Sequence, residues 1–183
     1  ETKNTVKNIG LFDLTPFSKF ELKGDNAHEV LQKLCTANIK HEIGKCTYTQ
    51  MLNPDGGIET DLTVVCLEKN YFRIISSAAT RERDKFHINK YLPSNLVLTD
   101  VTDDYCVLGV FGPNSRLLMQ DLSKDDFSQE NFKFAHSKYI SIDNIKIWTQ
   151  RLSYVGELGY ELYIKINDAR KIYNLIIKKG SKY

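Results

Sequence analysis

The sequence of 183 residues has few prolines, few cysteines and almost no net charge. Its four prolines stand singly, so no proline-rich linker divides the chain. Its four cysteines form neither a Cys-x-x-Cys pair nor a zinc-type spacing, which favours buried reduced thiols. Lys and Arg total 25 against 23 for Asp and Glu, a net charge of +2. This balance leaves no excess charge for nucleic acid or an anionic membrane, so a ligand must be recognised locally.

Long hydrophobic runs are absent as well. The longest apolar stretches, such as residues 62–67, fall far short of the roughly 20 residues that span a bilayer. Residues 1–8 are polar, so we expect a signal peptide to be absent or already removed. These features predict a protein of the cytoplasm, or of the mitochondrial matrix in a eukaryote, with no membrane or nucleic-acid partner.

Turns and hydrophobic periodicity predict an α+β protein. Strands are expected at residues 17–23, 46–52, 58–67, 71–76, 105–111, 138–142, 145–154 and 160–166. Helices are expected after Gly24 with an Asn26–Glu29 capping box, at 80–92, from Gly112 to 122, and after a cap at Asn167. We therefore expect two closely packed, α/β-sandwich-like subdomains with antiparallel sheets and a weak boundary near residues 93–102.

One glycine-rich turn lies beside an aspartate within a predicted strand. Residues 53–57 read Asn-Pro-Asp-Gly-Gly, and the following strand alternates so that Glu59, Asp61 and Thr63 share a face. Aspartate is depleted within strands, so its position before the apolar stretch suggests a role. From composition alone, a solvent-facing or turn-bonding aspartate is the more ordinary interpretation.

A second glycine-rich turn lies beside a glutamate. Residues 153–163 contain two glycines that allow a tight turn or a close approach of the backbone to a ligand. Glu161 projects opposite to Tyr160 and Leu162, and Tyr154 lies across the same predicted hairpin. A carboxylate and an aromatic ring could then face a common space that suits a flat heteroaromatic molecule. The simpler alternative is a hairpin with a surface glutamate and a core tyrosine.

Several common catalytic motifs are missing. The chain has no Gly-x-Gly-x-x-Gly after a strand, no Walker loop and no nucleophile elbow. Its four histidines lack metal-ligand spacing, so no metal site is predicted. The two glycine-rich turns are therefore the places where chemistry is expected.

Four segments, taken in order, resemble a known family. They read Gly-Leu-Phe-Asp-Leu-Thr-Pro-Phe at 10–17, Tyr-Thr-Gln-Met-Leu-Asn at 48–53, Gly-Gly-Ile-Glu-Thr-Asp-Leu at 56–62 and Tyr-Val-Gly-Glu-Leu-Gly-Tyr-Glu at 154–161. Together they resemble the folate-binding aminomethyltransferase family, which includes the T-protein of the glycine cleavage system. The wording looks most similar to the folate-binding parts of dimethylglycine and sarcosine dehydrogenases. The resemblance covers nearly the whole chain, so residues 1–183 are expected to form an aminomethyltransferase folate-binding domain.

The resemblance implies that tetrahydrofolate binds in a central channel between subdomains. Asp61 matches the family's catalytic aspartate near the reacting folate nitrogens, and Tyr154 and Glu161 match the residues that hold the pterin. The chemistry agrees, because a carboxylate accepts the paired N–H donors of a pterin edge. An anionic Asp61 orients the folate and stabilises positive charge as the one-carbon unit transfers. Tyr48, in the second segment, is counted among the cofactor-binding residues.

Two positions depart from the T-protein pattern, and the chain is expected to be shorter than the family's. Phe17 stands where a methionine is usual and is expected to form an apolar wall of the folate channel. Ser77 stands where asparagine is usual and is expected as a polar folate contact. Family chains continue into a third, barrel-like subdomain with a folate-contacting arginine. We expect this chain to lack that wall and to bind folate more weakly.

Three classes of function compete. The first is tetrahydrofolate-dependent transfer of an aminomethyl or methyl group from a small amine or a lipoyl-carrier donor, with Asp61 as the catalytic centre. The second is a non-catalytic folate-binding module, either of a flavoprotein dehydrogenase or related to folate-binding proteins of iron–sulfur assembly. A functional thiol at Cys46 would favour a relationship to the folate-binding proteins of iron–sulfur assembly. The third has no folate, and its motifs serve only hairpin geometry.

Overall fold

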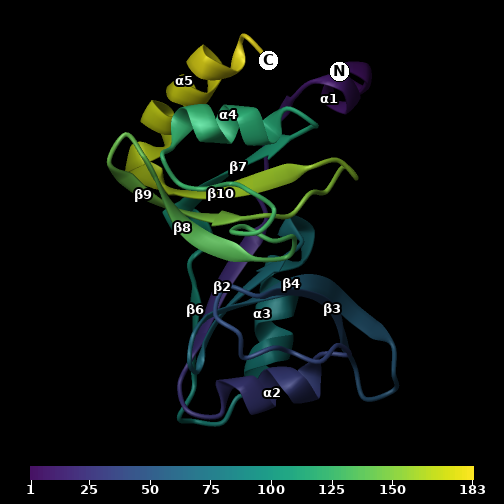
Figure 1. The fold of residues 1–183 in the computed structure, drawn as a ribbon. Helices are drawn as coiled ribbons and strands as arrows, with labels where there is room; N and C mark the ends of the chain where they lie inside the picture. The colour runs from purple at the N-terminus through teal and green to yellow at the C-terminus, as the bar shows by residue number, and fades with distance from the viewer. The chain divides into compact units, whose positions relative to one another are not determined.

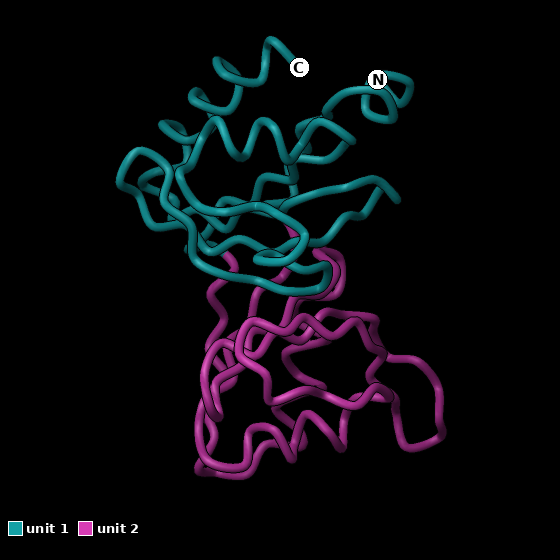
Figure 2. The backbone as a smooth tube through the Cα atoms, in the orientation of Figure 1, with its two compact units in different colours: residues 1–15, 103–183 teal, residues 16–102 magenta.

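The computed structural model describes residues 1–183 and divides them into two compact units. Unit 1 comprises residues 1–15 and 103–183, and unit 2 comprises residues 16–102, as Figure 2 shows. The chain therefore passes between the units twice. The sequence predicts a weak boundary near residues 93–102. It does not predict the first passage, after residue 15.

Unit 2 is a five-stranded antiparallel sheet with two helices on one face (Figure 1). The strand order is β3-β4-β5-β2-β6. Its strands are β2 (Ser18–Lys23), β3 (Cys46–Leu52), β4 (Ile58–Glu68), β5 (Tyr71–Ser76) and β6 (Val97–Asp100). Its helices are α2 (Ala27–Leu34) and α3 (Arg81–Lys90), with short 3-10 helices at Ala78–Thr80 and, at the border of the unit, Thr102–Asp104.

The core of unit 2 lies between the sheet and the two helices. From α2 come Ala27, Leu31 and Leu34, whose helical spacing produces one apolar stripe, and from α3 comes Ile88. The predicted capping box at the start of α2 is wrong. Asn26 adopts a left-handed φ of 70° and makes no side-chain cap hydrogen bond. In this conformation its side chain does not accept the first backbone N–H groups of the helix.

The turn between β3 and β4 confirms the first hairpin. The Asn53 side-chain oxygen accepts hydrogen bonds from the backbone N–H groups of Asp55 (3.0 Å) and Gly57 (2.8 Å). Gly56 has a φ of +82°, a conformation that an L-residue adopts only with strain. The turn fixes the register in which Gln50 lies opposite Asp61.

Unit 1 is also a five-stranded antiparallel sheet, in the order β1-β7-β10-β9-β8. Its strands are β1 (Gly10–Asp13), β7 (Tyr105–Phe111), β8 (Ser137–Ile142), β9 (Ile145–Gln150) and β10 (Gly159–Lys165). Its helices are α1 (Thr2–Lys7), α4 (Ser115–Leu122) and α5 (Ala169–Gly180), with a 3-10 helix at Ile166–Asp168. Helices α4 and α5 contribute side chains to one core cluster and cover one face of the sheet (Figure 1).

The structure departs from the sequence expectation at several elements of unit 1. Strand β9 ends at Gln150, so the predicted continuation to residue 154 is wrong, and residues 151–158 connect β9 to β10. Asn167 does not cap the last helix, because the helix begins after Asp168 without a side-chain cap hydrogen bond. No helix in the chain is long and apolar enough to cross a membrane.

The Asn53 turn yields a prediction about stability. Replacing Asn53 by alanine leaves two backbone N–H groups without their side-chain acceptor, so we expect the free energy of unfolding to fall by about 1 to 2 kcal/mol. Asn53→Asp keeps an acceptor oxygen and should lose less than about half as much. Urea unfolding followed by circular dichroism measures both variants. Equal losses would show that the side-chain hydrogen bonds do not hold the turn.

Candidate functional site

Three of the predicted site residues lie side by side at one end of the sheet of unit 2. Ser76 of β5 pairs with Leu62 of β4 on one side and with Ser18 of β2 on the other. Because the strands are antiparallel, the next row holds the residue before Leu62, the residue before Ser18 and the residue after Ser76. Continuing the register past the last paired row places Asp61, Ser77 and Phe17 next to each other, with Phe17 and Ser77 just outside their strands. Register alone therefore brings together residues that are up to 60 positions apart.

Asp61 has a direct partner in Tyr48. The Tyr48 hydroxyl donates a hydrogen bond of 3.0 Å to the Asp61 carboxylate, from a ring that is largely exposed. Thr60 and Leu62, on either side of Asp61, are buried on the helix-covered face, so Asp61 points to the opposite face. This confirms the predicted alternation of the strand. Asp61 is exposed and can reach a ligand.

A buried polar network supports the strand beneath Asp61. Asp84 of α3 is 1% exposed and accepts hydrogen bonds from the hydroxyls of Thr60 (3.2 Å) and Thr80 (2.7 Å). Arg83, its neighbour, donates to the Glu59 carbonyl. Two successive residues of α3 thus hold β4 immediately before Asp61. Asp84 carries no signal in the sequence, because only the packing of α3 on the sheet brings it to Thr60.

Glu161 lies in unit 1, on the face of β10 opposite the helices. It pairs with Gln150 of β9 and Gly109 of β7. Its carboxylate accepts one hydrogen bond, from the Tyr163 hydroxyl at 3.1 Å. Burial raises the pKa of Glu161 to about 7, and the Tyr163 bond opposes that rise only in part. A partly buried carboxyl with a single donor has capacity to accept N–H groups of a ligand.

Aromatic rings lie beside Glu161, where its cross-strand neighbour is a glycine. A Cβ atom at Gly109 would lie 2.6 Å from the Phe111 ring, so only glycine leaves that ring its place. Phe111 contacts the Phe12 ring with centroids 5.4 Å apart. Glu161 therefore lies opposite a glycine against which the buried Phe111 ring packs. Neither Gly109 nor these phenylalanines was singled out from the sequence.

Tyr154 is not placed as the hairpin prediction expected. It lies in the connection 151–158 after β9 has ended, and its side chain is 74% exposed. The six predicted residues thus fall into two groups. Phe17, Tyr48, Asp61 and Ser77 belong to unit 2, and Tyr154 and Glu161 belong to unit 1.

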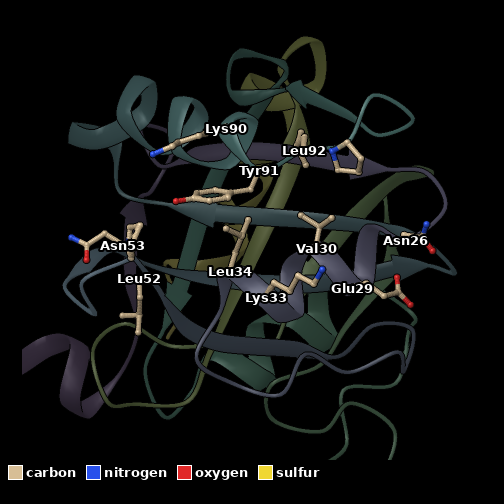
Figure 3. Close-up of a pocket in the computed structure, with 12 residues that line it drawn as sticks. Asn26, Glu29, Val30, Lys33, Leu34, Leu52, Asn53, Lys90, Tyr91 and Leu92 are labelled. Carbon is tan, nitrogen blue, oxygen red and sulfur yellow. The ribbon is translucent and has the colours of Figure 1, made fainter.

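Unit 2 also contains a cavity of about 870 Å³ that includes none of the predicted residues. Figure 3 shows α2 along one side, with Val30, Lys33 and Leu34 labelled, and Tyr91 and Leu92 after the end of α3 on the other. The cavity is open and its lining mixes apolar side chains with charges of both signs. Asp61, Tyr48 and the other predicted residues of unit 2 lie outside this cavity.

Comparison with known proteins places the chain in a family. The sequence model of the GCVT N-terminal domain matches residues 1–183. The chain belongs to the GCVT N-terminal domain family. The resemblance that its four motifs carry is thereby confirmed, and the two antiparallel α/β units are those of this family's fold. A solved relative, the glycine cleavage system aminomethyltransferase T from Bartonella henselae, has a TM-score of 0.83 at 21% identity, over 96% of this chain and 47% of its own.

Curated relatives of this GCVT N-terminal domain include dehydrogenases and aminomethyltransferases. Rat mitochondrial dimethylglycine dehydrogenase is 33% identical over 100% of this chain and 22% of its own length. The aminomethyltransferase of Anoxybacillus flavithermus is 29% identical over 94% of this chain and 48% of its own. The chain thus spans about a fifth of the dehydrogenase and about half of the transferase. The match supports the family and leaves the reaction to be argued from the site.

The raised pKa of Glu161 predicts a pH dependence of stability. Its pKa is about 7 in the fold against an ordinary 4.5, so the folded protein holds a proton that the unfolded chain releases above pH 4.5. Stability contributed by the protonated group is complete below pH 4.5 and is lost as pH rises to 7. Glu161→Gln does not titrate. We therefore expect the stability advantage of Glu161→Gln over the natural chain to grow across that window to about 3 kcal/mol and then to level off.

The control for this experiment is Glu157→Gln, in the connection that precedes β10. Chemical unfolding at intervals between pH 4.5 and 8 measures all three proteins. Burial raises the pKa of Glu161, so the growing advantage should appear in Glu161→Gln and not in the control. A difference between Glu161→Gln and the natural chain that is independent of pH would contradict the raised pKa.

Proposed function

We propose that this chain binds tetrahydrofolate as an aminomethyltransferase-type domain and takes part in one-carbon transfer from an amine-type donor. The observation that carries the proposal is Glu161: a carboxyl with one protein donor, a pKa of about 7 and aromatic rings beside it. A pterin fits such a group, because it is flat and offers adjacent N–H donors along one edge. Its paired hydrogen bonds would favour the ionised carboxylate.

Asp61 is the proposed catalytic residue. Its carboxylate is exposed, it is oriented by the Tyr48 hydroxyl at 3.0 Å, and its strand is held by Asp84 below. A preoriented negative charge at the reacting end of a ligand positions the nitrogens of that ligand. It also stabilises the positive charge that develops while the one-carbon unit is transferred. Tetrahydrofolate, when bound, supplies the nitrogen atoms that carry the one-carbon unit. Phe17 and Ser77, in the row of Asp61, are proposed as an apolar and a polar contact, and Tyr154 as a ring or hydroxyl contact to the pterin.

The donor is proposed by class. The aminomethyltransferase relatives match nearly the whole chain, which supports a small amine or a lipoyl-carried aminomethyl group. A second candidate is a non-catalytic folate-binding module working with a flavoprotein dehydrogenase, and the whole-chain match to dimethylglycine dehydrogenase favours it. Kinship with iron–sulfur assembly proteins has less support, since it would need a functional thiol and Cys46 is 3% exposed.

Titration calorimetry with 5-formyltetrahydrofolate tests the pterin site. We expect Glu161→Gln to weaken binding about 10- to 100-fold at pH 8, because it removes the charge from a hydrogen-bonded pair. Glu157→Gln should bind like the natural chain. Equal binding by all three proteins would remove Glu161 from the site, and no binding by the natural chain at millimolar ligand would contradict the folate proposal.

Binding should also depend on pH. The ligand selects the ionised form of Glu161, whose pKa in the free protein is about 7. The affinity of the natural chain should therefore fall as pH drops below 7 and stay level above it, with about one proton released on binding at low pH. Calorimetry in two buffers of different ionisation enthalpy measures the proton count. An unchanged affinity between pH 5.5 and 8 would show that the ligand does not select the carboxylate.

Asp61→Asn separates binding from transfer. The amide keeps the shape and the Tyr48 contact but removes the charge, so we expect 5-formyltetrahydrofolate affinity within about twofold of the natural chain. The rate of one-carbon transfer from an aminomethyl-lipoyl donor should fall at least about 100-fold. Rapid-quench assays of product measure it. A binding natural chain that shows no transfer with this donor would favour the non-catalytic module.

A further inference from the structure

Three buried hydrogen-bond donors without acceptors gather in unit 1, away from Glu161. Arg151 follows β9, is 7% exposed, and donates to the Phe132 carbonyl and to the Gln129 side chain. Its third donor nitrogen, Nε, is buried and has no partner. Buried donors in folded proteins almost always have an acceptor, which is protein, water or a bound ion.

Tyr160 is the second of these donors. Its side chain is fully buried, its ring lies at 5.4 Å from the Phe127 ring and 5.6 Å from the Phe132 ring, and its hydroxyl has no partner. Phe132 is thus contacted by Tyr160 through its ring and by Arg151 through its carbonyl. Both donors therefore belong to one neighbourhood, beneath the segment that joins α4 to β8.

Arg116 is the third donor. It lies in the first turn of α4, its Nε is buried, and the side chain makes no hydrogen bond or ion pair. The preceding residue, Ser115, donates to the Leu158 carbonyl, which ties the start of α4 to the chain just before Tyr160. Helix α4 has eight residues, and the positive end of its dipole is at this turn.

No acidic side chain neutralises the two arginines. Asp125 is engaged by Ser123 and by the Ser141 backbone, and Asp126 by Ser128 and Asn131. Asp121, which follows Arg116 in the same helix, pairs with Lys182, and Asp143 pairs with Lys171. Burial and the charge of Arg116 both lower the pKa of Arg151, with the Tyr160 hydroxyl opposing them. The two guanidinium charges therefore repel each other, and neither has an acidic partner in the structure.

We propose that Arg116, Arg151 and Tyr160 form a binding site for a small oxyanion, either a carboxylate or a phosphate group. A guanidinium with unused N–H groups accepts such a ligand in a planar, bidentate geometry. The start of α4 adds its dipole to the two formal charges. The proposal does not rest on folate. Tyr160 and Glu161 are successive residues of one strand, so their side chains lie on opposite faces of the sheet.

Thermal unfolding of the chain in chloride buffer of fixed ionic strength, with added inorganic phosphate or acetate, tests the site. Selective binding to the folded state raises the melting temperature as the anion is titrated. We expect Arg116→Met to lose most of this response, because its side chain makes no other hydrogen bond. Arg170→Met, which removes an equally charged but exposed arginine of α5, should respond like the natural chain. Stabilisation by both anions indicates a carboxylate-or-phosphate site, and by phosphate alone a phosphate site.

Tyr160→Phe provides an independent readout that does not change charge. Without the anion it should be as stable as the natural chain or more stable, since it removes a buried hydroxyl that has no partner. With phosphate it should gain less, with an apparent Kd about 5- to 10-fold weaker. The proposal is overturned if neither anion stabilises the natural chain, or if Arg116→Met and Tyr160→Phe respond like it, which would indicate an adventitious ion only.

Discussion

The antiparallel register of β4, β5 and β2 is the constraint on which the site in unit 2 depends. Two ladders meet at Ser76, and their pairing decides that Asp61, Ser77 and Phe17 follow in the next row. A shift of one residue would turn Asp61 into the core and bring Thr60 out. The Asn53 turn fixes this register just before β4 begins, and the Asp84 hydrogen bond fixes it at Thr60 within the strand. Local turn chemistry and tertiary packing thus specify one arrangement.

Two carboxyl groups, in two units, have different surroundings. Asp61 is exposed and accepts a hydrogen bond from the Tyr48 hydroxyl. Glu161 is partly buried and accepts a hydrogen bond from the Tyr163 hydroxyl, and its burial raises its pKa to about 7. The proposed function assigns these two carboxyl groups different roles, catalysis to Asp61 and pterin recognition to Glu161.

The strands predicted most accurately from the sequence are those whose ends are marked by local turn signals. Cys46–Leu52, Tyr71–Ser76 and Tyr105–Phe111 were predicted with the bounds that the structure shows, because turns stand at their ends. Strands β1 and β6 were missed, since four-residue edge strands carry too little alternation. The row at Asp61, Asp84 beneath it and the glycine beside Glu161 depend on register and packing between distant segments, which no local pattern encodes.

The order of the two units along the chain has a consequence for biosynthesis. Unit 2 is a continuous stretch inserted between the two parts of unit 1. During translation it can complete its sheet while β1, already made, has no partner, because β7 lies some 95 residues later. Until Phe111 leaves the ribosome, β1 is an unpaired edge that must be kept from other chains. The inserted unit therefore sets how long the nascent chain is exposed to mispairing.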